Sequence, residues 1–169
     1  MADEIINRVA NSKLQVIDLE DFYPEGKRIV FDIKDWLFEG LVLREKDFRK
    51  HVVEHDWSQY QDAYVALYCS TDAIVPDWAY MLISVQLQDI AKLSVIGNLD
   101  QLESILYAQI ISELNTLDYK DMPVIIKGCS NKPVPANALV LLSQKLKPIA
   151  KSIMFGEACS SVPLYKRRK

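Results

Sequence analysis

The segment from residue 63 to 163 constrains the fold most, because apolar, strand-like runs alternate there with stretches of helical periodicity. The runs that read as strands lie at residues 64–68, 93–96, 124–127 and 152–155. Between them lie three amphipathic helices, which begin near Pro76, Asn98 and Ala136. This alternation predicts an α/β fold with a mostly parallel sheet, helices packed on it and right-handed crossovers.

Residues 1–60 carry shorter strand-like segments and one short helix. We expect the strands at residues 14–18, 28–33 and 37–43 and the helix at residues 46–55. The strands would form an N-terminal antiparallel β extension or extend the main sheet. This β-rich part at 1–60 would pack on an α/β core at 61–169, so that the 169 residues form one compact domain overall.

The composition excludes several classes of function. A formal net charge of -3 at pH 7 gives no field that would attract nucleic acid. The apolar stretches are too short to span a membrane, and the first residues are acidic where a signal peptide needs positive charge. We therefore expect a cytoplasmic protein that binds neither nucleic acid nor membrane. Three cysteines, an odd count in a reducing compartment, argue against a disulfide framework.

The three cysteines share one sequence setting, because each lies at or just past the end of a predicted strand and is followed by serine. They are Cys69, Cys129 and Cys159. Ligands of open α/β sheets gather outside the carboxyl ends of the strands, so three parallel strands would bring the thiols to one edge of one sheet. The helices after Cys69 and Cys129 also favour thiolate over thiol through their N-terminal dipoles.

Three thiolates suit a zinc ion with one further ligand, or an iron–sulfur cluster. The candidates for the further ligand are His55, Asp72 and Glu157. Two other interpretations stay open. Buried cysteines often act as inert small hydrophobic residues, and no CxxC motif is present. Alternatively, Cys69 is a reactive thiol with His55 as its base, although His55 also fits a histidine that interacts with the last carbonyls of its helix.

Residues 51–55 match the H-x-x-E-H pattern of one group of zinc peptidases. In that pattern His51 and His55 would bind zinc, and Glu54 would act as the base. The alternative is a solvated helix that carries these residues by chance. The helix is short and no flanking context supports a peptidase, so the alternative is favoured.

Seven short motifs, spread over nearly the whole chain, carry a family resemblance. They are DLEDFYPEG at 18–26, LREKDFR at 43–49, HDWS at 55–58, CSTDAIVP at 69–76, WAYML at 78–82, GCS at 128–130 and MFGE at 154–157. With them the sequence resembles an uncharacterised bacterial family, domain of unknown function 2480 (DUF2480). The family has no established activity, so the resemblance transfers no catalytic residue. It implies that the three Cys-Ser pairs belong to the family pattern and that His51 does not.

The resemblance also implies a setting near iron–sulfur assembly genes. Together these features predict an accessory protein in iron–sulfur cluster assembly or sulfur handling. It would bind zinc or an iron–sulfur cluster through Cys69, Cys129 and Cys159, with His55 as a further ligand. Its partners would be iron–sulfur assembly proteins, and a homo-oligomer is compatible with the sequence. The alternatives are a thiol-based or zinc-dependent enzyme, and a scaffold protein with structural cysteines.

Overall fold

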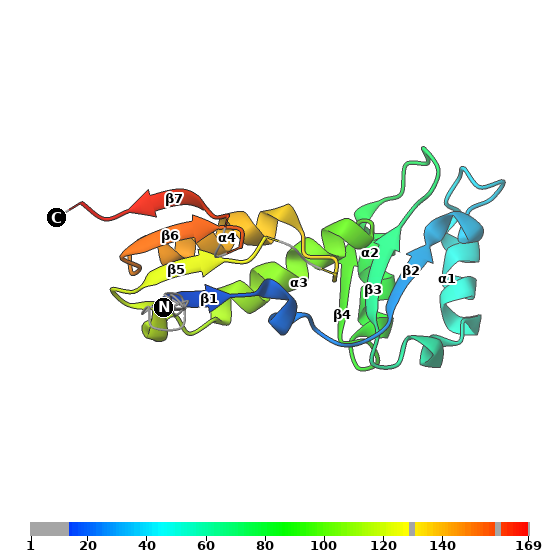
Figure 1. Ribbon diagram of the computed structural model, residues 1–169. Helices are drawn as coiled ribbons and strands as arrows, with labels where there is room; N and C mark the ends of the chain where they lie inside the picture. Colours follow the sequence, from blue (N-terminus) through cyan, green and yellow to red (C-terminus); the bar gives the residue numbers. More distant parts are fainter. Residues whose placement is uncertain (1–13, 129–130, 158–159, 169) are drawn as a thin grey trace, which may run out of the picture. The chain divides into compact units, whose positions relative to one another are not determined.

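The computed structural model describes residues 14–128, 131–157 and 160–168. These residues form an α/β fold with four α-helices and two mostly parallel sheets (Figure 1). The chain divides into two compact units. The central unit comprises Glu25–Glu103, and the terminal unit comprises Met1–Pro24 and Ser104–Lys169. Among the described residues, no helix is both long and apolar enough to cross a membrane.

The central unit contains a three-stranded parallel sheet in the order β2-β3-β4. Its elements are β2 (Arg28–Asp32), α1 (Glu45–Glu54), β3 (Tyr64–Tyr68), α2 (Asp77–Leu87) and β4 (Leu93–Ile96), with short 3-10 helices at Ile33–Trp36 and Trp57–Tyr60. Val65 and Leu67 of the middle strand are fully buried. They share a core with Ile83 of α2 and Phe48 of α1, since both helices present apolar residues at helical spacing.

The terminal unit contains a four-stranded sheet in the order β1-β5-β6-β7. Its elements are β1 (Gln15–Ile17), β5 (Pro123–Ile126), α4 (Ala136–Leu146), β6 (Ser152–Phe155) and β7 (Val162–Lys166), with 3-10 helices at Leu19–Phe22 and Leu117–Tyr119. The first three strands are parallel, and β7 is antiparallel to β6. The helix α3 (Leu99–Glu113) contains the boundary between the two units, and its Tyr107 and Ile111 belong to the core of the terminal unit.

The sequence correctly predicted the alternation of strands and helices and the mostly parallel pairing of the strands, but it did not predict the division into two sheets. Of the four strands expected in one sheet, β3 and β4 lie in the first sheet, and β5 and β6 lie in the second. The N-terminal strand β1 pairs with β5, and β2 pairs with β3. The N-terminal strands are therefore parallel members of these sheets and do not form an antiparallel extension. In place of the strand expected at 37–43, Phe38 and Val42 form an isolated bridge, because the chain reverses at Glu39 and Gly40 with positive φ angles.

The strand β7 was not expected from the sequence. Its residues Val162–Lys166 include Pro163 and lead into a basic run. Such a sequence is typical of a solvated tail. Pairing with β6 is what makes this segment a strand. The bounds of the two compact units also differ from the division expected near residue 60, since the distant segment that contains β1 groups with β5.

The two units are copies of one structural plan. In each, a parallel strand pair is joined by a helix, and a third parallel strand lies on the other side of the middle strand. The second copy follows the first at a constant interval of 59 positions, from Pro76 to Pro135 and from Gly97 to Gly156. Identical residues at this interval include Tyr60/Tyr119, Asp62/Asp121, Val65/Val124, Val75/Val134, Ala79/Ala138, Leu82/Leu141, Ser84/Ser143, Leu87/Leu146, Ile90/Ile149, Ala91/Ala150 and Lys92/Lys151.

The backbone repeats in the same way. Asp62 and Asp121 adopt left-handed φ angles of 57° and 58°. Their N–H groups donate to the carbonyls of Ile90 and Ile149, at 2.9 and 3.0 Å. The helices α2 and α4 both begin after a proline in extended conformation, as expected for a residue that lacks an N–H. The fold is therefore an internal duplication in which the first strand of the second copy, β1, precedes the first copy in the chain.

Candidate functional site

The carboxyl end of β3 carries Cys69, the one sequence-predicted cysteine among the described residues. Its side chain is half-buried and packs against the core of the central unit. Cys69 Sγ lies 3.4 Å from Thr71 Oγ1, and Thr71 Oγ1 donates to Gly40 O at 2.9 Å. These contacts fit the interpretation of Cys69 as a structural cysteine.

Asp32 holds the loop that follows Cys69. The N–H of Ser70 donates to Asp32 Oδ1 at 3.1 Å, and the N–H of Lys34 donates to the same oxygen at 3.0 Å. Burial acts to raise the pKa of Asp32, but the hydrogen bonds from Ser70 and Lys34 outweigh it and lower the pKa below its ordinary value. Asp32 is thus a carboxylate that caps a 3-10 helix and anchors a neighbouring loop at once.

The equivalent edge of the terminal unit is held by two carboxylates. Asp18 Oδ2 accepts a hydrogen bond from Lys127 Nζ at 2.7 Å. Glu20 Oε1 accepts from the backbone N–H groups of Asn131 and Lys132, so it anchors the loop that leads from β5 to α4. Burial acts to raise the pKa of Asp18, yet the bonds from Lys127 and from the N–H of Glu20 bring the pKa below its ordinary value.

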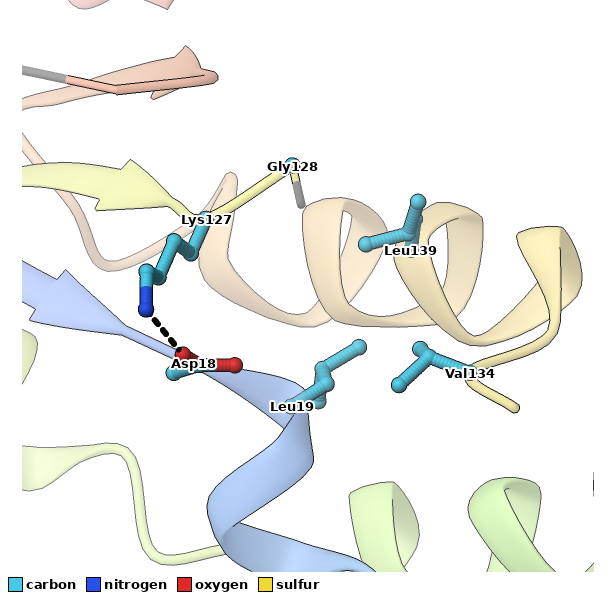
Figure 2. A pocket seen from close by; sticks show the side chains of 6 residues that line it. All are labelled: Asp18, Leu19, Lys127, Gly128, Val134 and Leu139. Atoms are coloured by element: carbon cyan, nitrogen blue, oxygen red, sulfur yellow. Dashed lines mark hydrogen bonds and ion pairs between the residues drawn. The ribbon is translucent and has the colours of Figure 1, made fainter. Parts of the chain in front are cut away.

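A small pocket lies at this edge. It has a volume of about 180 Å³, and Figure 2 shows its side chains with the ion pair of Asp18 and Lys127. Its lining residues are Asp18, Leu19, Lys127, Gly128, Val134 and Leu139. The hydrogen bond and charge of Asp18 raise the pKa of Lys127, and the charges of Glu157 and Glu20 act in the same direction. The pocket therefore pairs the ammonium group of Lys127 with the carboxylate of Asp18.

Cys129 and Cys159 lie outside the described residues, but the residues beside them are described. β5 and β6 are neighbouring parallel strands in which Ile126 pairs with Phe155. Gly128 packs so closely on the end of β6 that a Cβ atom there would lie 2.9 Å from Phe155 Cζ and 3.4 Å from Gly156 Cα. The N–H of Ser160 donates to Glu157 O at 2.9 Å. The segments that lead into Cys129 and Cys159 thus leave the sheet side by side.

His55 lies in an aromatic cluster of the central unit. Its Nε2 atom is 3.0 Å from Tyr60 Oη and 3.1 Å from the Gln59 amide nitrogen. An amide nitrogen only donates, so His55 Nε2 acts as an acceptor. Burial lowers the pKa of His55, against the opposing charge of Asp56. The rings of Phe31, Trp36, Trp57 and Tyr60 surround the imidazole.

The residues of the H-x-x-E-H pattern make structural contacts. His51 stacks on Trp36 with a centroid distance of 5.6 Å, and Glu54 forms an exposed ion pair with Lys50. Among the described residues, no three His, Cys, Asp or Glu side chains form a group that could hold a metal ion. Asp72, the other central-unit candidate, provides no side-chain cap for α2, whose N-cap residue is Pro76.

A family model matches residues 3–167, nearly the whole chain. The chain belongs to the DUF2480 family. The family's description is "protein of unknown function", so membership in DUF2480 identifies no activity. No curated protein and no solved structure matches the chain.

Proposed function

We propose that the protein binds a thiophilic metal ion or an iron–sulfur cluster through Cys129 and Cys159, as an accessory in cluster assembly or sulfur handling. The observation that carries the proposal is the contact of Gly128 with Phe155 and Gly156. Neighbouring strands of a sheet lie about 4.8 Å apart. Chain segments that leave two such strands at the same edge can bring their cysteines within reach of one metal ion.

The proposal leaves out two residues that the sequence suggested as ligands. The thiol of Cys69 contacts Thr71 and packs against the core of the central unit. The Nε2 atom of His55 accepts a hydrogen bond from the Gln59 amide. The terminal unit itself offers the two thiols and the carboxylate of Glu157 as nearby donors.

Two thiolates are fewer ligands than a closed structural zinc site or a complete cluster needs. The remaining positions would be taken by a small thiol, a second protein or water. An incomplete ligand set suits a protein that receives and passes on a metal or a cluster, because a partner's ligands can enter the open positions. This supports a role as an accessory over a role as a permanent metalloenzyme, and iron–sulfur assembly proteins are the partners that it would meet.

The N-terminal end of α4 favours thiolate in the loop that precedes the helix. The helix α4 begins after Pro135 and directs its N-terminal end toward the same loop, which Glu20 anchors. Thiolate is the form that binds metal.

The test is metal, iron and sulfide analysis with absorption spectra of protein purified without oxygen. The proposal predicts bound zinc, or iron with sulfide, in the wild type and in Cys69→Ser. It predicts loss of the bound metal in Cys129→Ser and in Cys159→Ser. A wild type without metal whose Cys129 and Cys159 form a disulfide would contradict the proposal and favour a thiol-based enzyme. Thiols that neither bind metal nor react would favour a scaffold.

A further inference from the structure

The outer edge of β4 in the central unit has no neighbouring strand among the described residues. The internal duplication shows what such an edge can carry. β6 is the counterpart of β4, and β7 pairs with its outer edge in antiparallel orientation. In the terminal unit, β7 therefore covers the outer edge of β6. The corresponding edge of β4 in the central unit is open among the described residues.

The backbone of β4 is arranged to accept a strand. The N–H of Gly97 donates to Leu67 O at 2.9 Å, and its counterpart Gly156 donates to Ile126 O at 3.0 Å. Successive residues of a strand direct their N–H and C=O groups to opposite sides. Because Gly97 bonds toward β3, Ser94 and Ile96 direct their groups to the open edge.

A groove of about 310 Å³ lies beside this edge, between β4 and α2. It is lined by apolar and hydroxyl side chains without any charged group. Met81, Val85 and Ile96 on its walls are 65%, 68% and 58% exposed. In the terminal unit, Gln144 takes the place of Val85. At this one position the central unit is apolar where its copy is polar.

The strand β7 shows how such a groove can be filled. Its Tyr165 lies opposite Ile153 of β6 and packs against the core of the terminal unit. The counterpart of Ile153 is Ser94, whose hydroxyl lies 3.1 Å from that of Ser84. A strand paired with β4 would therefore place a side chain opposite Ser94, beside the groove.

The outer edges of the two sheets, formed by β4 and by β7, also differ in how they are protected against pairing with a further strand. Proteins block exposed edges with proline and charged residues. β7 contains Pro163 and ends at Lys166, which protects the outer edge of its sheet. β4 has the sequence LSVI, with neither proline nor charge. An unprotected edge beside an apolar groove is the arrangement expected of a pairing surface.

We infer that β4 pairs antiparallel with β4 of a second copy of this chain, around a two-fold axis at Val95. In this register Ile96 of each copy lies opposite Ser94 of the other, at the place that Tyr165 occupies in the terminal unit. The pairing is isologous, so each surface meets itself. The uncharged groove makes this possible without repulsion between like charges.

Sedimentation analysis of the full chain in EDTA tests this inference independently of the thiol site, since EDTA removes a metal-bridged dimer. We expect the wild type to be a dimer and Ile96→Lys to be a monomer with an unchanged circular dichroism spectrum. Val53→Lys on α1 is the matched control, because Val53 is an 84% exposed aliphatic residue of the same unit, and it should stay a dimer. A monomeric wild type, or a dimeric Ile96→Lys, would overturn the inference.

A second experiment remains decisive if Ile96→Lys does not fold. At a non-hydrogen-bonded antiparallel pair the Cα atoms are about 4.5 Å apart, within the range of a disulfide. In a chain whose three native cysteines are replaced by serine, Val95→Cys should form a disulfide-linked dimer on mild oxidation. Val53→Cys in the same background should stay monomeric under denaturing conditions. Absence of the Val95→Cys crosslink would refute the proposed register.

Discussion

Asp32 Oδ1 accepts a hydrogen bond from the backbone N–H of Ser70 at 3.1 Å and thereby ties the end of β2 to the loop that follows Cys69. The same oxygen caps the 3-10 helix at Ile33–Trp36. One carboxylate therefore fixes two backbone segments at the carboxyl edge of the central sheet. Asp18 has the same place in the terminal unit, where it caps a 3-10 helix and binds Lys127.

Asp32→Ala should loosen the loop around Cys69. We expect a loss of about 1 kcal/mol in the free energy of unfolding, the typical value for a capping side chain, and faster alkylation of Cys69. Urea unfolding and thiol modification of a chain with Cys129 and Cys159 replaced by serine measure both effects. Asp35→Ala, an exposed residue of the same 3-10 helix, is the control and should change neither. Equal alkylation rates in the two variants would mean that Asp32 does not hold the loop.

Asp18 should make the stability depend on pH in the acid range. Its pKa in the folded chain is lower than its ordinary value, so its contribution is present above the unfolded pKa and is lost as the pH falls through the folded pKa. Asp18→Asn should therefore lose less stability than the wild type between about pH 5 and pH 3. Lys127→Met should flatten the curve in the same direction, because the carboxylate loses its ion-pair partner. Denaturant unfolding at several pH values tests this prediction. It would be refuted if the free energy of unfolding of both variants depended on pH as strongly as that of the wild type.

The histidine of the aromatic cluster should have a structural role. Burial lowers the pKa of His55, so its folded state favours the neutral ring, and stability should fall as the pH drops below about 6.5. His55→Gln should remove this pH dependence and reduce stability at neutral pH through the lost contacts with Tyr60 and the surrounding rings. It should leave the metal content unchanged. Loss of bound metal in this variant would restore His55 as a ligand.

The duplicated turns offer a paired test of backbone strain. Asp62 and Asp121 have left-handed φ angles that glycine adopts without cost. Asp62→Gly should stabilise the protein by about 0.5–1 kcal/mol in urea unfolding. Asp121→Gly should give a smaller gain, because Asp121 also forms an ion pair with Arg167. A larger gain at Asp121 than at Asp62 would contradict this assignment.

Local patterns predicted the elements well. The strands at residues 64–68, 93–96 and 152–155 and the helix that begins at Ala136 have the expected bounds, because apolar periodicity and proline report local structure directly. Strand pairing is not local. Nothing in the sequence near Gln15 states that β1 pairs with β5, more than a hundred positions later, so the division into two sheets escaped prediction.

The site was predictable only in part. The place of Cys69 at the carboxyl end of a strand followed from the sequence, whereas the anchoring of its loop by Asp32 depends on a contact across the sheet. The internal duplication was present in the sequence as a constant interval between Tyr60 and Tyr119, Pro76 and Pro135, and Gly97 and Gly156. A comparison of the chain with itself would have found it and, with it, the counterpart strands β4 and β6.

The most direct test of the proposed function is the metal content per chain of Cys69→Ser and Cys129→Ser, purified side by side without oxygen. We predict full occupancy by zinc or iron in Cys69→Ser and none in Cys129→Ser, because the proposed ligands Cys129 and Cys159 follow β5 and β6 in the chain, and these strands are neighbours in one sheet. Loss of metal from Cys69→Ser with retention in Cys129→Ser would contradict the account.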